Sequence, residues 1–129
     1  MDIEKTAELA ADLKMHHGLN CAQAVTVALK EENGLDEETA KQLSAGFCAG
    51  MGNQKATCGS LIGAVMTAGM KTEGKGTLRK AKEISEQFES LCGALTCADL
   101  KKLTGGKPLC PCDECVRNAI RAYGFVMDQ

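Results

Sequence analysis

Three of the eight cysteines directly follow a residue type that commonly begins helices, in the pairs Asn20-Cys21, Thr57-Cys58 and Thr96-Cys97. A fourth, Cys115, lies two residues after Asp113, at the start of another helical pattern. Asn, Thr and Asp are favoured N-caps because their side-chain oxygens accept hydrogen bonds from the free amides of a first turn. A cysteine there lies in the positive end of the helix dipole, which stabilises its thiolate. Because thiolates attack disulfides and bind metals, we expect these four cysteines to carry the chemistry.

The number of cysteines favours metal binding or redox chemistry over a disulfide scaffold. Eight in 129 residues is about 6%, below the roughly 8–10% of short disulfide-rich chains. The sequence opens Met-Asp-Ile-Glu-Lys-Thr, without the basic and then apolar pattern of an export signal, so we expect a cytoplasmic protein. In a reducing compartment, cysteines in this number more often bind metal or do redox chemistry. For Cys48 and Cys92, a role as small buried apolar side chains is equally consistent with the sequence.

Helical patterns must position these cysteines. The sequence is 44% hydrophobic but only 3% aromatic, so its core must be rich in Ala, Leu, Val and Met, and Ala and Leu are good helix formers. The segment 58–70 carries no charge, which is typical of a buried helix. We therefore predict one cysteine-rich helical domain over residues 1–129. Its fold is a compact all-α bundle of about six to seven helices around a buried central helix at about 58–70. The expected helices cover residues 3–16, 20–30, 36–47, 58–70, 77–91, 97–103 and 113–126.

The apolar spacing also predicts which side chains face the core. Leu43 is expected to point inward from its helix, and so are Leu78 and Leu91 from theirs. In the last helix the expected inward residues are Val116, Ala119, Ile120, Tyr123 and Val126. The loop 46–56 contains three glycines, which permit positive φ and a close approach of the backbone.

Other kinds of chemistry find little support. The formal charge of −2 and a pI near 5.7 argue against a nucleic-acid or acidic-membrane partner. The longest apolar stretch, 56–70, is too short to span a bilayer. Gly50-Met51-Gly52 is not followed by the lysine and Ser/Thr of a phosphate-binding loop. His16 and His17 could supply an imidazole ligand near Cys21, although histidine also suits a helix C-terminus, which is the interpretation we prefer.

If the four helix starts converge, they form a pocket that is lined with thiolates and tolerates anions. Iron–sulfur clusters need such surroundings, with several cysteine ligands and dipoles that compensate the charge of the cluster. Four thiolates would also bind zinc, although structural zinc sites usually use two Cys-x2-4-Cys pairs. The only close group here is Cys110-x-Cys112-x2-Cys115, whose Cys-x2-Cys part has the spacing of a redox dithiol or half a metal site. Cys112 and Cys110 are therefore further candidate metal ligands.

Several segments match one known cysteine pattern. They are Asn20-Cys21-Ala22-Gln23-Ala24-Val25, Gly46-Phe47, Gly50-Met51-Gly52, Cys58-Gly59-Ser60-Leu61-Ile62-Gly63-Ala64, Phe88, Gly93, Cys97 with Leu100, and Cys115 with Val116 and Ala119. Over roughly residues 18–120 the sequence resembles the family of small redox-active proteins named for a C_GCAxxG_C_C pattern, with Ser60 where the family motif has Ala. The resemblance implies a redox role, often beside oxidoreductases or transporters. It also implies that the family's four cysteines correspond to Cys21, Cys58, Cys97 and Cys115, and that Cys48, Cys92, Cys110 and Cys112 lie outside the pattern.

The leading hypothesis is that Cys21, Cys58, Cys97 and Cys115 bind an iron–sulfur cluster for electron transfer or redox sensing. A first alternative is thiol–disulfide exchange by the same four cysteines, acting as catalytic thiols without a metal. A second alternative is a structural module held together by zinc. The sequence leaves open whether the protein is an enzyme and whether it forms a homo-oligomer, and it implies a redox partner protein without identifying it.

Overall fold

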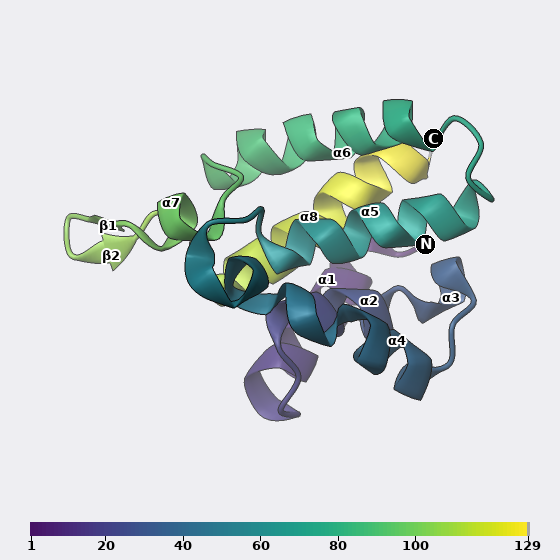
Figure 1. Ribbon diagram of the computed structural model, residues 1–129, viewed down its shortest axis with the longest axis horizontal. Helices are drawn as coiled ribbons and strands as arrows, with labels where there is room; N and C mark the ends of the chain where they lie inside the picture. Colours follow the sequence, from purple (N-terminus) through teal and green to yellow (C-terminus); the bar gives the residue numbers. More distant parts are fainter. Residues whose placement is uncertain (129) are drawn as a thin grey trace.

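Helices dominate the computed structural model, which describes residues 1–128 (Figure 1). This part of the chain forms eight α-helices, a 3₁₀ turn, a π turn and one small hairpin, so the all-α prediction is confirmed. The α-helices are α1 (Ile3–His16), α2 (Cys21–Ala28), α3 (Lys30–Asn33), α4 (Glu37–Ser44), α5 (Gly59–Lys71), α6 (Thr77–Cys92), α7 (Cys97–Lys101) and α8 (Cys112–Met127). The other elements are η1 (Ala45–Phe47), η2 (Gly50–Gln54), β1 (Leu103–Thr104) and β2 (Lys107–Pro108). None of the described helices is both long and apolar enough to cross a membrane.

Each of the seven expected helices is present, with small changes at their ends. The expected helix 20–30 turns at Leu29 and continues as the separate α3. The expected helix 97–103 ends at Lys101, because the chain then enters the antiparallel β1–β2 hairpin. Part of the expected loop 46–56 is wound into η1 and η2, and its backbone has positive φ at Ala49 and Met51 as well as at glycines.

Helices α5 and α8 hold the interior of the bundle. α5 packs against α2, α3, α6 and α8, as expected for a central helix, and α8 packs against α1, α2, α5 and α6. Figure 1 shows α5, α6 and α8 together, with α1 to α4 below them and α7 and the hairpin extending to one side. The predicted inward residues of α8, from Val116 to Val126, are all buried. Tyr123 is the largest fully buried side chain among the described residues.

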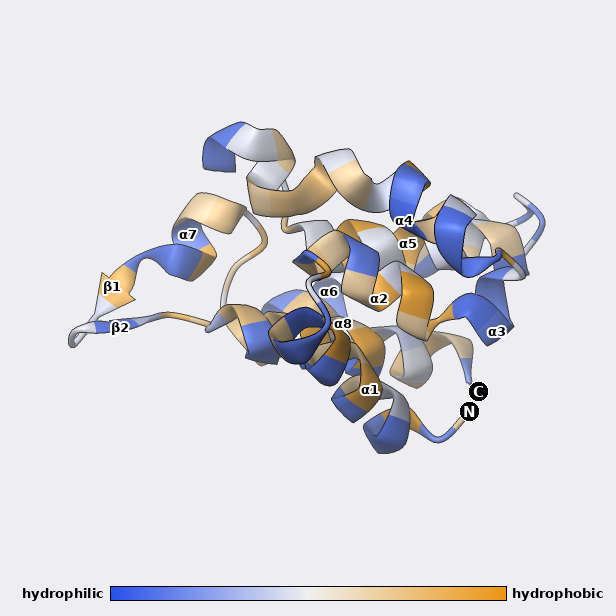
Figure 2. Ribbon diagram, turned by 90° about the horizontal axis from the view of Figure 1, so that it is seen from below, coloured by the Kyte–Doolittle hydropathy of each residue, from blue (hydrophilic) through white to orange (hydrophobic). Residues whose placement is uncertain are grey.

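Three leucines that were predicted to face the core are exposed instead. Leu78 is 86% exposed, Leu43 is 54% exposed and Leu91 is 47% exposed. In α6 the buried stripe runs through Ile84, Phe88 and Cys92, which are spaced four residues apart. Leu78, six residues before Ile84, lies off that stripe, whereas Leu91, three residues after Phe88, lies at its edge in the last turn of α6. An apolar residue outside the stripe, such as Leu78, therefore stays at the surface. Figure 2 shows that the helices carry both apolar (orange) and polar (blue) residues along their length.

Two glycines of α5 let this helix approach its neighbours closely. A Cβ atom at Gly63 would lie 2.8 Å from Oγ1 of Thr26 in α2, and one at Gly59 would lie 2.6 Å from the carbonyl oxygen of Phe47. Real side chains do not tolerate such distances, so both positions require a residue without Cβ. The start of α5 is thereby held against the start of α2 and the η1 turn.

Candidate cysteine site

Seven of the eight cysteines line one pocket of about 100 Å³. The pocket lies where four helices begin, since Cys21 is the first residue of α2, Cys97 of α7 and Cys112 of α8, and Cys58 immediately precedes α5. Cys21, Cys58, Cys97 and Cys115, the four predicted site residues, all line it, and so do Cys48, Cys110 and Cys112. All eight cysteines are free thiols.

The cap predictions are right at two of the four helix starts. Asn20 caps α2 in a full capping box, in which its side chain accepts from the amide of Gln23 at 2.9 Å and the Gln23 side chain accepts from the Asn20 amide at 3.0 Å. Thr96 caps α7, since its hydroxyl accepts from the amide of Asp99 at 3.3 Å. These two caps fix the backbone directly before Cys21 and Cys97.

The other two cap predictions are wrong. α5 begins one residue later than expected, so Cys58 itself stands at the N-cap and Thr57 lies outside the helix. α8 begins one residue earlier than expected, at Cys112, with Pro111 in extended geometry at the N-cap position and no side-chain cap. Asp113 is therefore inside the first turn and does not cap it, and Cys115 is the fourth residue of the helix. Its amide already donates to the carbonyl of Pro111 at 2.9 Å.

A short extended contact ties two of these cysteines together. Thr57 forms an isolated antiparallel β-bridge with the segment before α7. On one side of this bridge the Cys58 amide donates to the carbonyl of Leu95 at 2.8 Å, and on the other the Cys97 amide donates to the carbonyl of Ala56 at 3.1 Å. These hydrogen bonds hold the starts of α5 and α7 side by side, although 38 residues separate them along the chain. Thr57 thus serves the site through its backbone.

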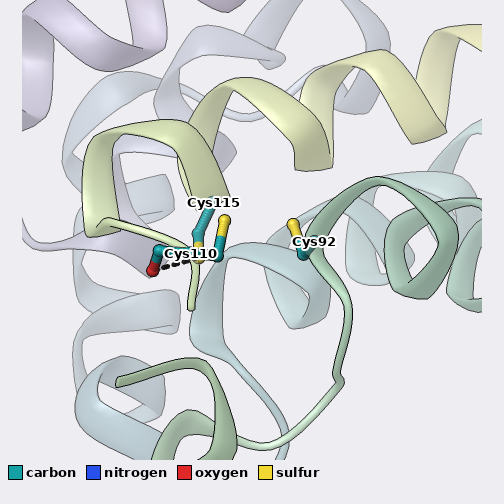
Figure 3. Close-up of side chains that lie close together, drawn as sticks. All are labelled: Cys92, Cys110 and Cys115. Carbon is teal, nitrogen blue, oxygen red and sulfur yellow. Dashed lines mark hydrogen bonds between the residues drawn. The ribbon is translucent and has the colours of Figure 1, made fainter. Parts of the chain in front are cut away.

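Three buried sulfurs form a tight group deep in the site (Figure 3). The Sγ atoms of Cys92, Cys110 and Cys115 all lie within 4.8 Å of one another. Within the described residues this is the group whose ligand atoms are close enough to hold one metal ion. The Cys115 thiol also donates to the carbonyl of Cys110 at 3.5 Å. Cys92, at the end of α6, is the cysteine that does not line the pocket, so it joins the group from the side away from the pocket.

A second close contact joins Cys21 and Cys48, which also line the pocket. The Cys21 thiol lies 3.8 Å from the sulfur of Cys48. Cys58 is coupled to both groups, since Cys115 and then Cys21 lower the pKa of its thiol. The sulfurs therefore form one connected set rather than isolated pairs.

The thiols of this set do not ionise alike. Hydrogen bonds from Cys115 and then from Cys21 lower the pKa of Cys58, and hydrogen bonds from Cys110 and then from Cys115 lower the pKa of Cys92. The thiols that donate these hydrogen bonds have raised pKa values. Hydrogen bonding to Cys58, followed by burial, raises the pKa of Cys21, and hydrogen bonding to Cys110 and Cys58 raises that of Cys115. The site thus favours two thiolates, each held by neighbouring thiols that keep their protons.

Positive groups surround the pocket. Lys14 and Lys101 line it together with the cysteines. Burial raises the pKa of Cys97, and the nearby Lys101 ammonium offsets part of that effect. Helix starts add further positive potential, because α2, α5 and α8 all direct their free amides toward the same place. The pocket is therefore suited to negative charge.

One polar side chain of the pocket lacks a partner. Ser60 is fully buried and lines the pocket, and its hydroxyl has no hydrogen-bond partner within residues 1–128. The hydroxyl and the Ser60 amide would become donors to Cys58 once its sulfur is a thiolate, and this is one of the smaller causes of the lowered pKa of Cys58. Buried hydroxyls rarely remain unpaired, so this one fits a pocket that holds an acceptor.

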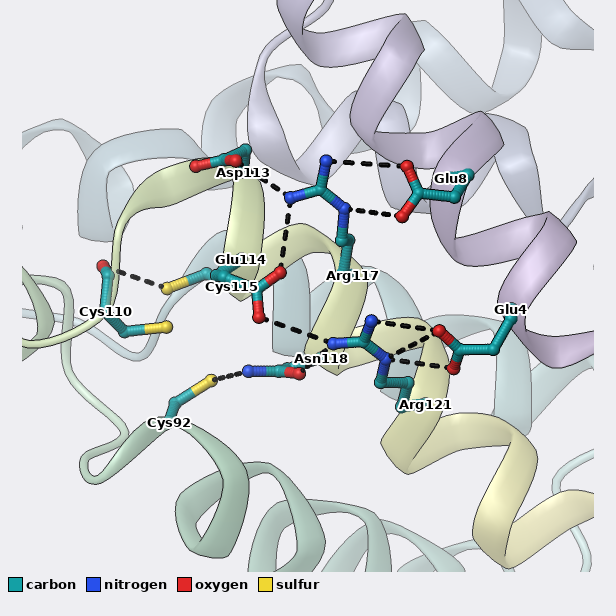
Figure 4. A network of polar contacts seen from close by, with 10 residues as sticks. All are labelled: Glu4, Glu8, Cys92, Cys110, Asp113, Glu114, Cys115, Arg117, Asn118 and Arg121. Atoms are coloured by element: carbon teal, nitrogen blue, oxygen red, sulfur yellow. Dashed lines mark hydrogen bonds and ion pairs between the residues drawn. The ribbon is translucent and has the colours of Figure 1, made fainter.

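An ion-pair network between α1 and α8 lies next to the cysteines and contacts Cys92 (Figure 4). Asn118 of α8 donates to the sulfur of Cys92 at 3.4 Å and accepts from Arg121 at 2.8 Å. Arg121 in turn pairs with Glu4 of α1 at 3.0 Å. One turn earlier, Arg117 pairs with Glu8 at 2.9 Å. The network joins α1 to α8 and fixes the orientation of the Asn118 amide toward sulfur.

Sequence reasoning missed the involvement of Cys48 and Cys92, and it ranked Cys110 only as a further candidate. The spacing Cys110-x-Cys112-x2-Cys115 was the available signal for Cys110, whereas no local pattern marks the other two. His16 and His17 are exposed and do not line the pocket. The His17 ring contacts Asp12 at 3.1 Å, and α1 ends at His16, in agreement with the helix C-terminus interpretation.

An all-helical fold that gathers its cysteines at the starts of four helices defines a class of cysteine-rich protein suited to metal or thiol chemistry. Residues 19–124 match the family described as "Putative redox-active protein (C_GCAxxG_C_C)", and the chain belongs to this family. The resemblance found in the sequence is thereby confirmed. The three buried cysteines that lie close together could hold a metal ion. Neither curated proteins nor solved structures provide a match.

Proposed function

We propose that this protein is a redox protein that binds an iron–sulfur cluster through Cys21, Cys58, Cys97 and Cys115, for electron transfer to a partner protein or for redox sensing. The observation that carries the proposal is the convergence of these four family cysteines on one pocket. Four cysteine thiolates are the usual ligand set of both [2Fe–2S] and [4Fe–4S] clusters.

The chemistry of the pocket fits this group. A cluster with four thiolate ligands is an anion, and the helix starts, Lys14 and Lys101 provide compensating positive charge. The unpartnered Ser60 hydroxyl could donate to a ligand sulfur. The four proposed ligands are at most 8% exposed, so the protein would keep water from the cluster. When bound, the cluster would supply one-electron chemistry, and the chain's own residues would hold it, screen its charge and limit its contact with solvent.

A mononuclear metal site is the second candidate, and a different observation favours it. Four sulfurs around one zinc lie about 3.8 Å apart, because Zn–S bonds are about 2.3 Å long and tetrahedral. The sulfurs of Cys92, Cys110 and Cys115, within 4.8 Å of one another, need only small movements to reach that spacing. Cys58, which lines the same pocket as Cys110 and Cys115, would be the fourth ligand. Only two of these four cysteines belong to the family pattern, which is why we rank this candidate second.

The test is anaerobic purification and cluster reconstitution of the wild type, of Cys58→Ser and of Cys112→Ser. Cys112 is the matched control, because it lines the same pocket but is exposed and lies outside the family pattern. We expect iron, acid-labile sulfide and visible absorption in the wild type and in Cys112→Ser, and their loss in Cys58→Ser. Wild-type protein that stays colourless without sulfide would overturn the proposal. One equivalent of tightly bound zinc in that protein, lost in Cys92→Ser, would establish the mononuclear site instead.

A further inference from the structure

Cys48 is a pocket cysteine that the proposed cluster does not use, and it lies next to one that the cluster does use. The sulfurs of Cys48 and Cys21 are 3.8 Å apart. A disulfide bond is about 2.05 Å long, so the two sulfurs would have to approach by less than 2 Å to become bonded. The other close sulfurs, those of Cys92, Cys110 and Cys115, form a separate group.

Access separates this pair from the buried group. Cys92, Cys110 and Cys115 are at most 5% exposed, so solvent meets little of them in the folded protein. Cys21 is 8% exposed, but its neighbour Cys48 is half-buried at the edge of the pocket. Cys48 therefore belongs to a close sulfur pair and is also exposed enough to react with a small molecule.

The backbone around Cys48 can accommodate the required movement. Cys48 has extended geometry, with φ −66° and ψ 152°, between the η1 and η2 turns, so no regular helix holds it. The residues that follow, Ala49 to Gly52, all have positive φ. Irregular segments of this kind adjust more readily than the first turn of α2, to which Cys21 belongs. We expect Cys48 to move toward Cys21 rather than the reverse.

We propose that Cys48 and Cys21 form a reversible disulfide with a low-molecular-weight disulfide as oxidant, and that this bond and the cluster exclude each other. In the first step the Cys48 thiolate attacks one sulfur of the oxidant, which gives a mixed disulfide and releases one small thiol. The small thiolate released in this step takes the proton of Cys21, whose sulfur then attacks the Cys48 sulfur, and the second small thiol leaves. The two cysteine sulfurs lose two electrons, the oxidant gains them, and the two cysteine protons end on the two released thiols.

The exclusion follows from the shared residue. A sulfur in the disulfide cannot serve as a thiolate ligand, so oxidation removes Cys21 from the ligand set. Conversely, a bound cluster would hold Cys21 away from Cys48. This second half rests on the proposed function, whereas the disulfide itself does not.

Trypsin separates the relevant cysteines, which makes the pairing directly measurable. Cleavage after lysine places Cys21 in peptide 15–30, Cys48 in peptide 42–55 and Cys58 in peptide 56–71, with one cysteine in each. Metal-free reduced protein is treated anaerobically with oxidised glutathione, alkylated and digested without reductant. We expect peptide 15–30 linked to 42–55 in the wild type and in Cys112→Ser, and its absence in Cys48→Ser. Linkage of 15–30 to 56–71, or no linked peptide, would overturn the pairing.

The exclusion is tested on iron-loaded protein that has been desalted and given the same oxidised glutathione. We expect the linked peptide to form about tenfold more slowly, or in about tenfold lower amount, than in metal-free protein. A bound cluster stabilises the protein in which Cys21 is a ligand, so it disfavours the form with the disulfide. Equal rates in the two forms would overturn the exclusion. If the reduced protein takes up no iron, the proposed function and the mutual exclusion of cluster and disulfide fail together. The Cys21–Cys48 disulfide is then still decided by the linked-peptide result.

Discussion

The close approach of α5 to α2 predicts that an alanine at Gly63 destabilises the protein. The added Cβ would lie 2.8 Å from Thr26 Oγ1, and 3.2 Å from both the carbonyl oxygen of Ala22 and Cγ1 of Val25. Thr26 cannot move aside without loss, because it is 1% exposed and its hydroxyl donates to the Ala22 carbonyl at 2.8 Å. Relief therefore requires that the two helices separate or that a buried hydrogen bond breaks.

The magnitude follows from two opposing effects. Overpacking in a close-packed core costs about 1–3 kcal/mol. Replacing glycine by alanine inside a helix returns about 1 kcal/mol, so the net loss for Gly63→Ala is about 1 kcal/mol. Gly69, in the same helix, is the matched control, since a Cβ there would meet only Thr77 Cγ2 at an ordinary 3.8 Å. Gly69→Ala should therefore gain up to about 1 kcal/mol, and the two variants should differ by about 2 kcal/mol.

The assay is urea unfolding of the reduced, metal-free protein followed by far-UV circular dichroism. We expect the free energy of unfolding to fall in Gly63→Ala and to rise in Gly69→Ala relative to the wild type, with thermal midpoints separated by roughly 6–10 °C for a domain of this size. If Gly63→Ala is as stable as Gly69→Ala, then α2 and α5 do not pack as closely as described. The position of Cys58 beside Cys21 would then need another explanation.

Three further substitutions test the helix starts and the network. Asn20→Ala should lower the free energy of unfolding by about 1 kcal/mol in urea titrations, because it removes the capping box of α2; no loss would show that the box does not hold this start. Thr57→Val should change the free energy of unfolding by less than about 0.5 kcal/mol in the same titrations, because Thr57 contributes through its backbone and not as a cap. A loss of about 1 kcal/mol, as expected for a removed cap, would contradict this. The hydrogen bond from Arg121 lowers the pKa of Glu4, so this pair stabilises the fold above the unfolded carboxyl pKa and the gain is lost as the pH falls. Glu4→Gln should therefore be less stable than the wild type at pH 6, and the difference should shrink as the pH falls below about 4.3, the unperturbed Glu pKa. A difference that stays constant would refute the ion pair.

Local signals were enough to predict most of the helices. Capping residues and apolar spacing act within one or two turns, so they are visible in a single sequence. Asn20 with Gln23 is an example, since both halves of its capping box lie within four residues. The segment 58–70 was predicted to be buried from its lack of charge, and α5 occupies the interior as expected. Its first turn was misplaced because Thr57 is held by a β-bridge to a strand-like segment far along the chain.

The composition of the site depended on contacts that no local signal reports. Cys48 and Cys92 have no neighbouring motif, and they reach the other sulfurs only because η1, α6 and α8 pack around the start of α5. The exposure of Leu78 has the same origin. An apolar stripe shows which residues share a helix face, but the neighbouring helix decides which part of that face it covers. α6 is covered along Ile84 and Phe88, so Leu78 remains outside.

The packing of α8 also bears on how the protein is made. α8 follows every other described helix in the sequence, yet it packs against α1, α2, α5 and α6 and carries Cys115. During synthesis, which adds about 5–20 residues per second, the thiols of Cys21, Cys48 and Cys58 would leave the ribosome several seconds before the helix that encloses them. In that interval nascent chains expose sulfurs that the finished protein buries. A metal ion delivered before α8 has docked would therefore meet an open site, and oxidation in the same interval would join cysteines that the native fold keeps apart.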